Sequence, residues 1–461
     1  MRYISTRGQI APLSFKDAVM MGLANDGGLL LPESYPLLTA AELEKWRTLS
    51  YRELAFQVMA PFADDMPAAD LKRLIDRSYD RFDHPEITPV VEVDGLRILE
   101  LFHGPTLAFK DVALQFLGNL FEYLLEERDQ RMNIVGATSG DTGSAAIHGV
   151  RGKERISIFI LHPHGRTSPI QALQMTTVTD ANVHNLAIDG TFDDCQNIVK
   201  ALFNDLSFKE QLGLGAVNSI NWARVLAQVV YYFYAYFRVT TQPGQEVLFS
   251  VPTGNFGDIF AGYVAKRMGL PIRTLILATN ENNILSRFIQ DGDYSLTQVV
   301  PTLSPSMDIQ LASNFERYLF HLFGNDPSRV RQAFADLGRT GRIVFSDAEM
   351  AQVRREFSSS TVDRQKTIQT IADTFQQTGY ILDPHTAVGV GAAQELTTNG
   401  SPMICLATAH PAKFPDAVRE AIGQDPPQPA SLKGIDKLPS RCQTMAADID
   451  QIKAFITEYA C

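Results

Sequence analysis

One lysine lies inside an apolar segment, and its amine is the first candidate for chemistry in this chain. Lys110 stands between Phe109 and Asp111 in the segment HGPTLAFKDVALQF, which runs from His103 to Phe116. An ammonium group loses favourable hydration on burial, so such a lysine either extends its tip to solvent, as most lysines do, or performs a function. A desolvated lysine can condense with an aldehyde, which is how enzymes hold pyridoxal phosphate as a Schiff base. That chemistry also requires groups elsewhere that bind a phosphate.

Two glycine-rich loops each follow an expected strand and precede an expected helix, where an anion is favoured. The loop TGNFGD, from Thr253 to Asp258, suits a phosphate, and the loop TSGDTG, from Thr138 to Gly143, adds hydroxyls that suit an α-carboxylate. Either loop alone is also explained as a tight turn or a helix cap. Neither the dinucleotide spacing nor the P-loop spacing is present in TGNFGD, so a nucleotide enzyme is weakly supported.

Composition narrows the class of protein. With 461 residues, of which 45% are hydrophobic and 20% charged, we expect an ordinary globular protein of two or three domains. A net charge of -11 argues against a nucleic-acid partner. The four cysteines form no CxxC pair and no cluster with histidines, so we expect neither a metal site nor a disulfide framework. Without a leader peptide or a long apolar run, we expect a cytoplasmic protein with no membrane partner.

The elements that must position these residues alternate between strands and helices. A strand at Ile98 to Leu101 and a helix with apolar positions from Ala113 to Leu124 flank the lysine loop. The pattern continues with strands expected at 133–137, 156–161, 247–251, 273–277 and 403–408, and helices at 144 onward, 169–175, 192–204, 221–239 and 259–268. Such alternation indicates parallel α/β layers.

We therefore predict an α/β fold of two parallel-sheet lobes, preceded by a mainly helical N-terminal domain. The predicted N-terminal domain spans residues 1–95, and the lobe that carries the lysine spans 96–215. The second lobe, with the phosphate loop, spans 216–440 and contains a helical insertion at about 326–379. Residues 441–461 are predicted to form a C-terminal helical tail.

Five segments taken together resemble one family. The segments are HGPTLAFKD, GATSGDTGSAAI, NSINWAR, VPTGNFGD and ATAHPAKF, in this order, and ISTRG and LANDGGLLLP near the N-terminus also match. They are similar to the threonine synthase family of pyridoxal-phosphate enzymes, which have the tryptophan-synthase-β-like fold (fold type II) with the cofactor between two lobes. The resemblance covers nearly the whole chain.

The resemblance implies roles for single residues in cofactor binding. Lys110 would form the Schiff base and act as the catalytic base. The residues that would bind the cofactor phosphate are Gly254, Asn255, Phe256, Gly257 and Asp258. Thr408 would bond to the pyridine nitrogen, and a hydroxyl there makes the ring a weaker electron sink than a carboxylate would. Asp141 stands where related enzymes commonly carry Asn beside the phenolic oxygen, so either a proton is shared there or Asp141 points elsewhere.

The resemblance also implies the substrate, O-phospho-L-homoserine, which would react with water to give L-threonine and phosphate by γ-elimination and β-hydration. The implied substrate-binding residues are Thr138, Ser139 and Thr142 for the α-carboxylate, and Asn221 and Arg224 for the departing phosphate. A guanidinium suits a phosphate by its fork of donors, although an ion pair at a helix start would also explain Arg224.

Several alternatives remain open at this point. The same scaffold supports a serine or threonine dehydratase, a phospho-amino-acid phosphate-lyase, or a non-catalytic cofactor-binding protein, and a phosphate-binding protein without cofactor is a further possibility. The N-terminal motifs and the segment Asn221 to Arg224 favour the synthase, and intact Lys110 argues against a silent protein. Lys413 either faces a phosphate or is solvated. The histidines His103, His385 and His410 receive no role, and the sequence leaves monomer and homodimer open.

Overall fold

The computed structural model describes residues 1–396 and 400–461, and the chain divides into two compact units. The six-stranded unit comprises Met1–Asp76, Asp83–His103 and Ser219–Pro426, and the five-stranded unit comprises Arg77–Phe82, Gly104–Asn218 and Pro427–Cys461. The predicted N-terminal domain thus lies in the same unit as most of the predicted second lobe, whereas the C-terminal segment lies in the unit of the lysine. None of the described helices is long and apolar enough to cross a membrane.

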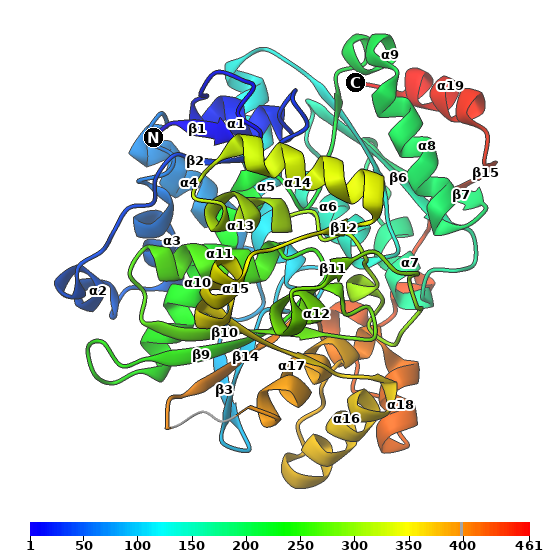
Figure 1. Cartoon of the computed structure of the whole chain (residues 1–461). Coiled ribbons are helices and arrows are strands. Elements are labelled where there is room, and N and C mark those ends of the chain that lie inside the picture. The colour runs from blue at the N-terminus through cyan, green and yellow to red at the C-terminus, as the bar shows by residue number, and fades with distance from the viewer. Residues whose placement is uncertain (397–399) are drawn as a thin grey trace. The chain divides into compact units, whose positions relative to one another are not determined.

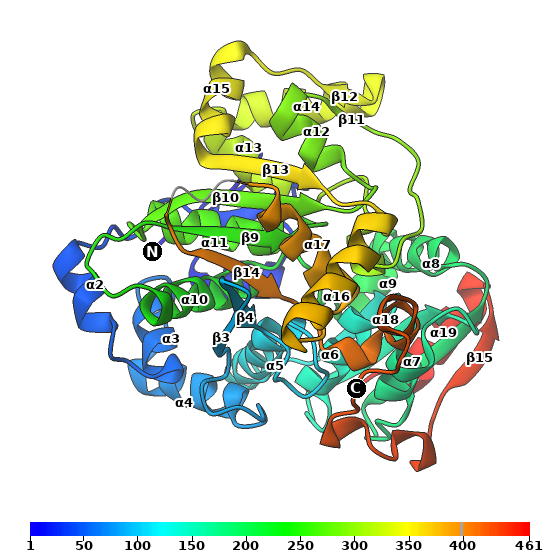
Figure 2. The same cartoon turned by 90° about the horizontal axis from the view of Figure 1, so that it is seen from below.

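A largely parallel sheet forms the centre of the six-stranded unit, and Figure 2 shows β10, β9 and β14 side by side. Its order is β13 (Phe357–Thr361), β10 (Ile272–Thr279), β9 (Val247–Pro252), β14 (Met403–Ala407), β4 (Leu96–Glu100) and β3 (Val90–Val93). Of these described strands, only β3 runs antiparallel to its neighbour. Every residue of β9 and β14 is buried, as expected for strands covered on both faces.

Helices cover the two faces of this sheet. On one face Ser250 donates to the Gly389 carbonyl of α17 (Pro384–Gln394), and α16 (Arg364–Thr378) packs on α17. On the other face the ring of Phe249 contacts Tyr232 of α10 (Trp222–Val239), which packs on α11 (Gly257–Arg267). Successive strand residues point to opposite faces, which explains why neighbours in β9 contact different helices.

The five-stranded unit has an entirely parallel sheet. Its order is β15 (Gln443–Ala446), β7 (Val183–Asp189), β6 (Ile156–Pro163), β5 (Met132–Ala137) and β8 (Leu214–Gly215). Its helices are α5 (Lys110–Glu127), α6 (Asp141–Val150), α7 (Pro169–Thr176), α8 (Phe192–Asn204), α9 (Leu206–Gln211) and α19 (Ile449–Tyr459). In Figure 1 the red α19 lies beside the green α8, and both contribute to one apolar cluster on the sheet.

The N-terminal segment is mainly helical, as predicted. Its helices are α1 (Phe15–Met21), α2 (Ala40–Trp46), α3 (Tyr51–Met59) and α4 (Ala68–Tyr79). A short antiparallel pair, β1 (Tyr3–Ser5) with β2 (Leu30–Pro32), was not predicted. The N-terminal segment therefore offers backbone carbonyls, such as that of Leu30 in β2, to side chains elsewhere in the six-stranded unit.

Most predicted strands and helices are confirmed, and the capping box of Thr191 and Asp194 opens α8 as expected. Two assignments were wrong. The predicted helical insertion contains α14 (Pro327–Thr340), α15 (Asp347–Glu356) and α16, but its middle forms β13 at the edge of the sheet. The sequence FSSST contains a single apolar residue, so it shows no alternation of apolar and polar positions. In the structure only Phe357 and Ser360 of this strand are buried. The predicted helical tail begins with strand β15, which pairs with β7.

The strand before the lysine loop also differs from the prediction. It was expected in the lysine lobe, but β4 lies in the six-stranded unit, where it pairs with β14. The remaining elements of that unit are α12 (Ile284–Asp291), β11 (Tyr294–Ser295), α13 (Phe315–Leu322), β12 (Arg342–Ile343) and α18 (Pro415–Ile422).

Candidate active site

The backbone around Lys110 is fixed by the acid that follows it. Asp111 accepts hydrogen bonds from the backbone nitrogen and the hydroxyl of Thr106, each at 2.8 Å. The Thr106 carbonyl in turn accepts from Nε2 of Gln174 on α7, at 3.0 Å. A carboxylate in the first turn of α5 also interacts favourably with the helix dipole. These contacts place Lys110 at the first position of α5.

The Lys110 amine is buried beside a carboxylate. Lys110 is 7% exposed, and its Nζ lies 3.5 Å from Oδ2 of Asp141. The other oxygen of Asp141 accepts a hydrogen bond of 2.7 Å from Nε2 of Gln171. Gln171 therefore orients the carboxylate and leaves Oδ2 toward the lysine. The Asp141 carboxylate thus lies beside the Lys110 amine, and its relation to the phenolic oxygen of a cofactor stays a prediction.

The TSGDTG loop leads into α6, and the side chain of Thr138 binds backbone amides of this loop. The Thr138 oxygen accepts from the backbone nitrogens of Gly140 and Gly143, at 3.0 and 2.9 Å, which leaves its proton for another acceptor. The N-cap residue Gly140 has no side chain, and in the first turn of α6 the Thr138 hydroxyl binds the Gly143 amide. Ser139 is exposed and Thr142 is half-buried. A carboxylate-sized anion fits such a helix start.

The predicted phosphate loop has the geometry of an anion cradle. Phe256 adopts φ of 63° and precedes α11, whose first turn has no side-chain cap. A Cβ on Gly254 would lie 3.0 Å from the Met307 Cα, so the loop leaves no room for a side chain there. The Asn255 carbonyl accepts from Asn314, through the backbone nitrogen at 3.0 Å. Free amides and the helix dipole then favour a phosphate at this end of α11.

The carboxylate of Asp258 is not part of that cradle. Its Oδ1 accepts from the hydroxyls of Tyr231 and Tyr232 on α10, at 2.5 and 2.9 Å. Burial raises the pKa of Asp258 to about 6. The side chain thus points away from the loop, where a carboxylate would repel a phosphate. The expected role of Asp258 is corrected to its backbone amide at the start of α11.

Thr408 directly follows β14, and its hydroxyl has no partner among the described residues. Its backbone nitrogen donates to the Thr386 hydroxyl at 3.1 Å, and that hydroxyl donates to Asp383, the N-cap of α17. Thr408 is 6% exposed, yet its Oγ1 has no hydrogen-bond partner among the described residues. A buried hydroxyl without a partner costs free energy, which indicates that a ligand completes it.

The two residues predicted to bind the substrate phosphate have different environments. Asn221 caps α10, because Oδ1 accepts from the Ala223 nitrogen at 3.1 Å while Nδ2 donates to the Val19 carbonyl at 2.9 Å. Arg224, one turn later, is 5% exposed, and its Nε and Nη1 have no hydrogen-bond partner within the described ranges. Burial lowers the pKa of Arg224 to about 10, so the guanidinium stays charged at neutral pH. Of the two residues, Arg224 is therefore the one with buried donors that lack partners in the described structure.

Comparisons with known proteins assign the whole chain. Three family models match: "Threonine synthase N terminus" at residues 2–79, "Pyridoxal-phosphate dependent enzyme" at 82–333 and "Threonine synthase, C-terminal" at 386–456. The threonine synthase of Pseudomonas aeruginosa is 49% identical, with 100% of this chain and 98% of the relative covered. The chain belongs to the threonine synthase family.

Solved structures agree with this assignment to the family. The structure of the threonine synthase from Brucella melitensis with bound pyridoxal phosphate matches with a TM-score of 0.98 at 49% identity, covering 100% of this chain and 99% of that one. The yeast threonine synthase matches with a TM-score of 0.95 at 45% identity, covering 99% and 98%. The predicted fold class, activity and cofactor are thereby confirmed: the protein is a fold type II, pyridoxal-phosphate-dependent lyase of this family.

For a threonine synthase, the residues present fit the cofactor. Lys110 supplies a buried amine, the start of α11 supplies uncapped amides, and Thr408 supplies a buried hydroxyl without a partner in the described structure. These three groups match the aldehyde, the phosphate and the ring nitrogen of pyridoxal phosphate. No cluster of metal ligands occurs in the part of the chain that the structure describes.

Some residues of the site carry no signal in the sequence. Gln171 is a polar residue on a short helix, and Asn314 precedes α13, so neither is marked by a motif. Among the residues left open by the sequence, Lys413 is fully buried, which excludes the solvated alternative. His103 bonds to Glu100 and Asp83; burial lowers its pKa, but the two carboxylates outweigh burial and raise it overall. This pairing gives His103 a structural role.

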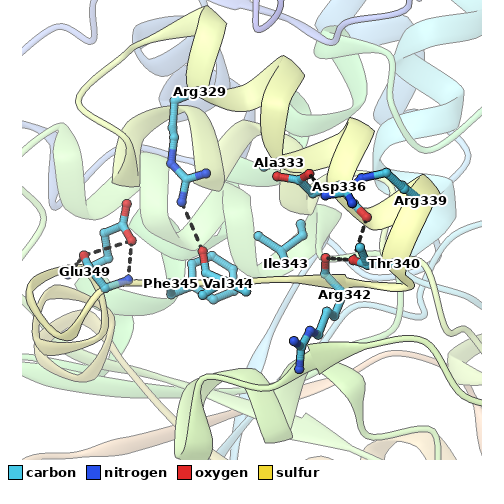
Figure 3. A pocket seen from close by; sticks show the side chains of 11 residues that line it. Arg329, Ala333, Asp336, Arg339, Thr340, Arg342, Ile343, Val344, Phe345 and Glu349 are labelled. Atoms are coloured by element: carbon cyan, nitrogen blue, oxygen red, sulfur yellow. Dashed lines mark hydrogen bonds and ion pairs between the residues drawn. The ribbon is translucent and has the colours of Figure 1, made fainter.

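A pocket of about 620 Å³ lies elsewhere, along α14 and α15 (Figure 3). Its charged residues serve local structure. Arg329 donates to the Val344 carbonyl at 3.0 Å, Asp336 pairs with Arg339 at 2.9 Å, and Glu349 accepts from the Ser346 nitrogen at the start of α15. None of the residues predicted to do chemistry lines this pocket.

Proposed function

We propose that this threonine synthase converts O-phospho-L-homoserine and water into L-threonine and phosphate, with Lys110 as catalytic base and Arg224 as the ligand of the departing phosphate. The observation that carries the assignment is the buried, charged and unsatisfied guanidinium of Arg224. A dehydratase acting on serine or threonine has no phosphate for such a group to bind. A phosphate ester supplies the oxygens that its donors lack.

Lys110 both attaches the cofactor and moves protons. Pyridoxal phosphate, when bound, withdraws electrons from the substrate carbons next to the amine, so that protons there can be removed. With the cofactor bound, Nζ of Lys110 would take a proton at Cα of the substrate and later one at Cβ. Asp141, at 3.5 Å, stabilises the ammonium that forms, and Gln171 keeps the carboxylate in place.

The six-stranded unit contributes groups that bind rather than react. The amides of Gly254, Asn255, Phe256, Gly257 and Asp258 would hold the cofactor phosphate. The Thr408 hydroxyl would meet the ring nitrogen, supported by its buried, unsatisfied state. Since a hydroxyl does not hold that nitrogen protonated, proton transfers depend on the placement of Lys110.

The substrate would be bound at its two anionic ends. Thr138, Ser139 and Thr142, together with the start of α6, would hold the α-carboxylate. Arg224 would hold the phosphate that departs. Asn221 acts on Arg224 through its cap of α10 rather than through a contact of its own.

The test is an analysis of products. Purified protein is incubated with O-phospho-L-homoserine, and threonine, 2-oxobutyrate and inorganic phosphate are measured. We expect threonine and phosphate in equal amounts. In parallel incubations, formation of pyruvate from serine or of 2-oxobutyrate from threonine would instead support a dehydratase. Release of phosphate without threonine would support a phosphate-lyase.

The proposal extends to assembly and location. We propose a monomer or a homodimer acting in the cytoplasm, on the basis of composition and the biosynthetic reaction of the family. Light scattering of the purified protein, with and without cofactor, distinguishes the two assembly states. A tetramer or larger species would overturn this part of the proposal.

A further inference from the structure

A fully buried arginine joins three segments of the six-stranded unit. Arg317 on α13 is 0% exposed. Its Nε and Nη2 donate to the Leu30 carbonyl at 3.0 and 2.7 Å, Nη2 also donates to the Ile220 carbonyl, and Nη1 donates to Oδ1 of Asn314. All of these acceptors are neutral, and the guanidinium lies 5.9 Å from the centre of the Trp222 ring. Burial lowers the pKa of Arg317 to about 10, so it carries a charge at neutral pH.

Asn314 connects Arg317 to the phosphate loop, residues 253–258. Its backbone nitrogen and Nδ2 donate to the Asn255 carbonyl at 3.0 and 3.3 Å, and Nδ2 also donates to the Ser219 carbonyl at 3.2 Å. In a trans peptide, the carbonyl of one residue and the amide of the next point in opposite directions. With the Asn255 carbonyl held by Asn314, the Phe256 amide is turned to the other side. Asn314 thus sets the direction of one amide in the cradle.

The loop requires such support because its backbone is strained. Phe256 has φ of 63°, a left-handed conformation that is unfavourable for residues other than glycine. A hydrogen bond on the preceding carbonyl offsets that strain.

The N-terminal segment also binds α13, the helix that carries Arg317. Glu316, next to Arg317, accepts from the Thr6 hydroxyl at 2.5 Å and from Arg7 at 3.1 and 3.0 Å. Leu30, whose carbonyl binds Arg317, belongs to β2. The motifs ISTRG and LANDGGLLLP therefore attach to α13 at two adjacent residues.

We propose that Arg317 is a positioning residue for the cofactor phosphate, which connects the N-terminal segment to the phosphate loop through Asn314. It orients the loop amides and adds a positive charge behind a cradle that has no cationic side chain of its own. This inference rests on the proposed role of residues 254–258 as the phosphate cradle. It predicts that loss of Arg317 weakens binding of the phosphate and not of the rest of the cofactor.

The test compares two forms of the cofactor. Apoprotein is titrated with pyridoxal phosphate and with pyridoxal, which lacks the phosphate, and binding is followed by absorbance. For Arg317→Met and for Asn314→Ala we expect pyridoxal phosphate to bind about 10- to 100-fold more weakly, the range expected for a lost hydrogen bond to a charged group. Pyridoxal binding should change by less than about twofold. The double variant should be little worse than either single variant, since both break one chain of contacts.

A matched control removes another arginine that holds the N-terminal segment. Arg331 on α14 donates to the Arg7 carbonyl, and among the described residues it makes no hydrogen bond to the phosphate loop. Arg331→Met should leave the ratio of the two affinities at its wild-type value. If Arg317→Met does not fold, Arg317→Lys and Asn314→Ala carry the same comparison.

Each outcome is decisive. Equal losses for pyridoxal phosphate and pyridoxal would show a merely structural role and overturn the inference. Unchanged affinity for pyridoxal phosphate in Asn314→Ala would also overturn it. If the wild-type protein binds pyridoxal phosphate no better than pyridoxal, the proposed phosphate cradle itself fails.

Discussion

Two regions of the molecule satisfy their polar groups in opposite ways. The lysine region comprises Lys110, Asp141 and Gln171 of the five-stranded unit, and the loop region comprises the loop 253–258 with Thr408 and Arg224 of the six-stranded unit. Around Lys110, charges are paired within the protein: the amine lies beside Asp141, and Asp141 is bound by Gln171. In the other unit, Thr408 keeps a hydroxyl without a partner and Arg224 keeps two donor nitrogens without partners in the described structure. Both regions are buried to a similar degree.

This difference agrees with the roles proposed for the two regions. A catalytic base needs its counter-charge in place before substrate arrives, because reorganisation during the reaction raises the barrier. A recognition group is completed by the ligand, so it stays unsatisfied in the free protein. Each such group lowers stability by about 1–3 kcal/mol until the ligand binds. The loop region therefore lowers the stability of the ligand-free protein, whereas the lysine region does not.

The largest expected effect comes from removing the paired amine. Lys110→Ala should lower kcat by at least about 10³-fold and abolish covalent attachment of the cofactor, because both the bond-forming amine and the base are lost. The fold should persist with lowered stability, because the buried Asp141 carboxylate loses the charge beside it but keeps its hydrogen bond from Gln171. Enzyme assays and the absorbance of protein-bound cofactor check both expectations.

Lys153 provides the matched control for Lys110. It is also a buried lysine of the same unit, where Nζ donates to Asn119 at 2.7 Å and pairs with Glu122 at 2.9 Å. Lys153→Met should lower the thermal midpoint while the cofactor absorbance remains. A Lys110→Ala protein with residual covalent cofactor would contradict the assignment of the base.

Removing an unsatisfied group should instead separate binding from stability. Arg224→Gln should raise KM for O-phospho-L-homoserine about 10- to 100-fold, because a charged hydrogen bond to the phosphate is lost. In the absence of substrate the variant should be more stable by about 1 kcal/mol, because an uncompensated buried charge is gone. Steady-state kinetics and thermal unfolding of the substrate-free enzyme measure the two changes.

Arg287→Gln serves as the control for this variant. Arg287 is a half-buried arginine of the same unit that is already satisfied by Asp293 and Ser295. Its replacement should lower stability and leave KM unchanged, the reverse of the result expected for Arg224. An Arg224→Gln protein that loses stability and keeps its KM would show that the guanidinium is structural.

A smaller effect is expected where the carboxylate beside Lys110 is neutralised. Asp141→Asn keeps an acceptor for Gln171 but removes the charge 3.5 Å from the amine. We expect kcat to fall about tenfold with KM changed less than twofold, because only the ammonium formed during the reaction is destabilised. Gln171→Leu should give a partial version of the same loss. A change confined to KM in either variant would contradict a role in proton transfer.

The sequence marked the candidate chemical groups of both regions more readily than the residues that support them. Lys110 and the two loops lie in contiguous motifs next to strand ends, so local patterns single them out, whereas the role expected of Thr408 came only from the resemblance to the family. Gln171 and Arg317 depend on partners distant in sequence: the Leu30 and Ile220 carbonyls lie 287 and 97 residues from Arg317. No local pattern marks such a pair. Strand β13 was missed for a related reason, because its serines follow no apolar alternation and its pairing with β10 supplies the order.

The side chain of Asp258 is a further feature that the sequence did not show. Its position in TGNFGD did not reveal that the carboxylate turns to the hydroxyls of Tyr231 and Tyr232. Its pKa, raised by burial from 3.8 to about 6, means that the folded protein binds a proton there that the unfolded chain has released. Stability should therefore fall as pH rises from about 4 to about 6 and stay constant for this group above that range.

The resulting prediction concerns pH rather than activity. Asp258→Asn still accepts from both tyrosines and has no charge to desolvate, so its stability should lack this pH dependence. Relative to wild type, the variant should gain about 2–3 kcal/mol between pH 4 and pH 8, less a constant penalty for its amide at the unpartnered Oδ2 position. Urea unfolding of both proteins across this range measures the difference. Parallel curves for the two proteins would mean that Asp258 is ionised at no energetic cost, and the group would then belong with the satisfied charges of the lysine region.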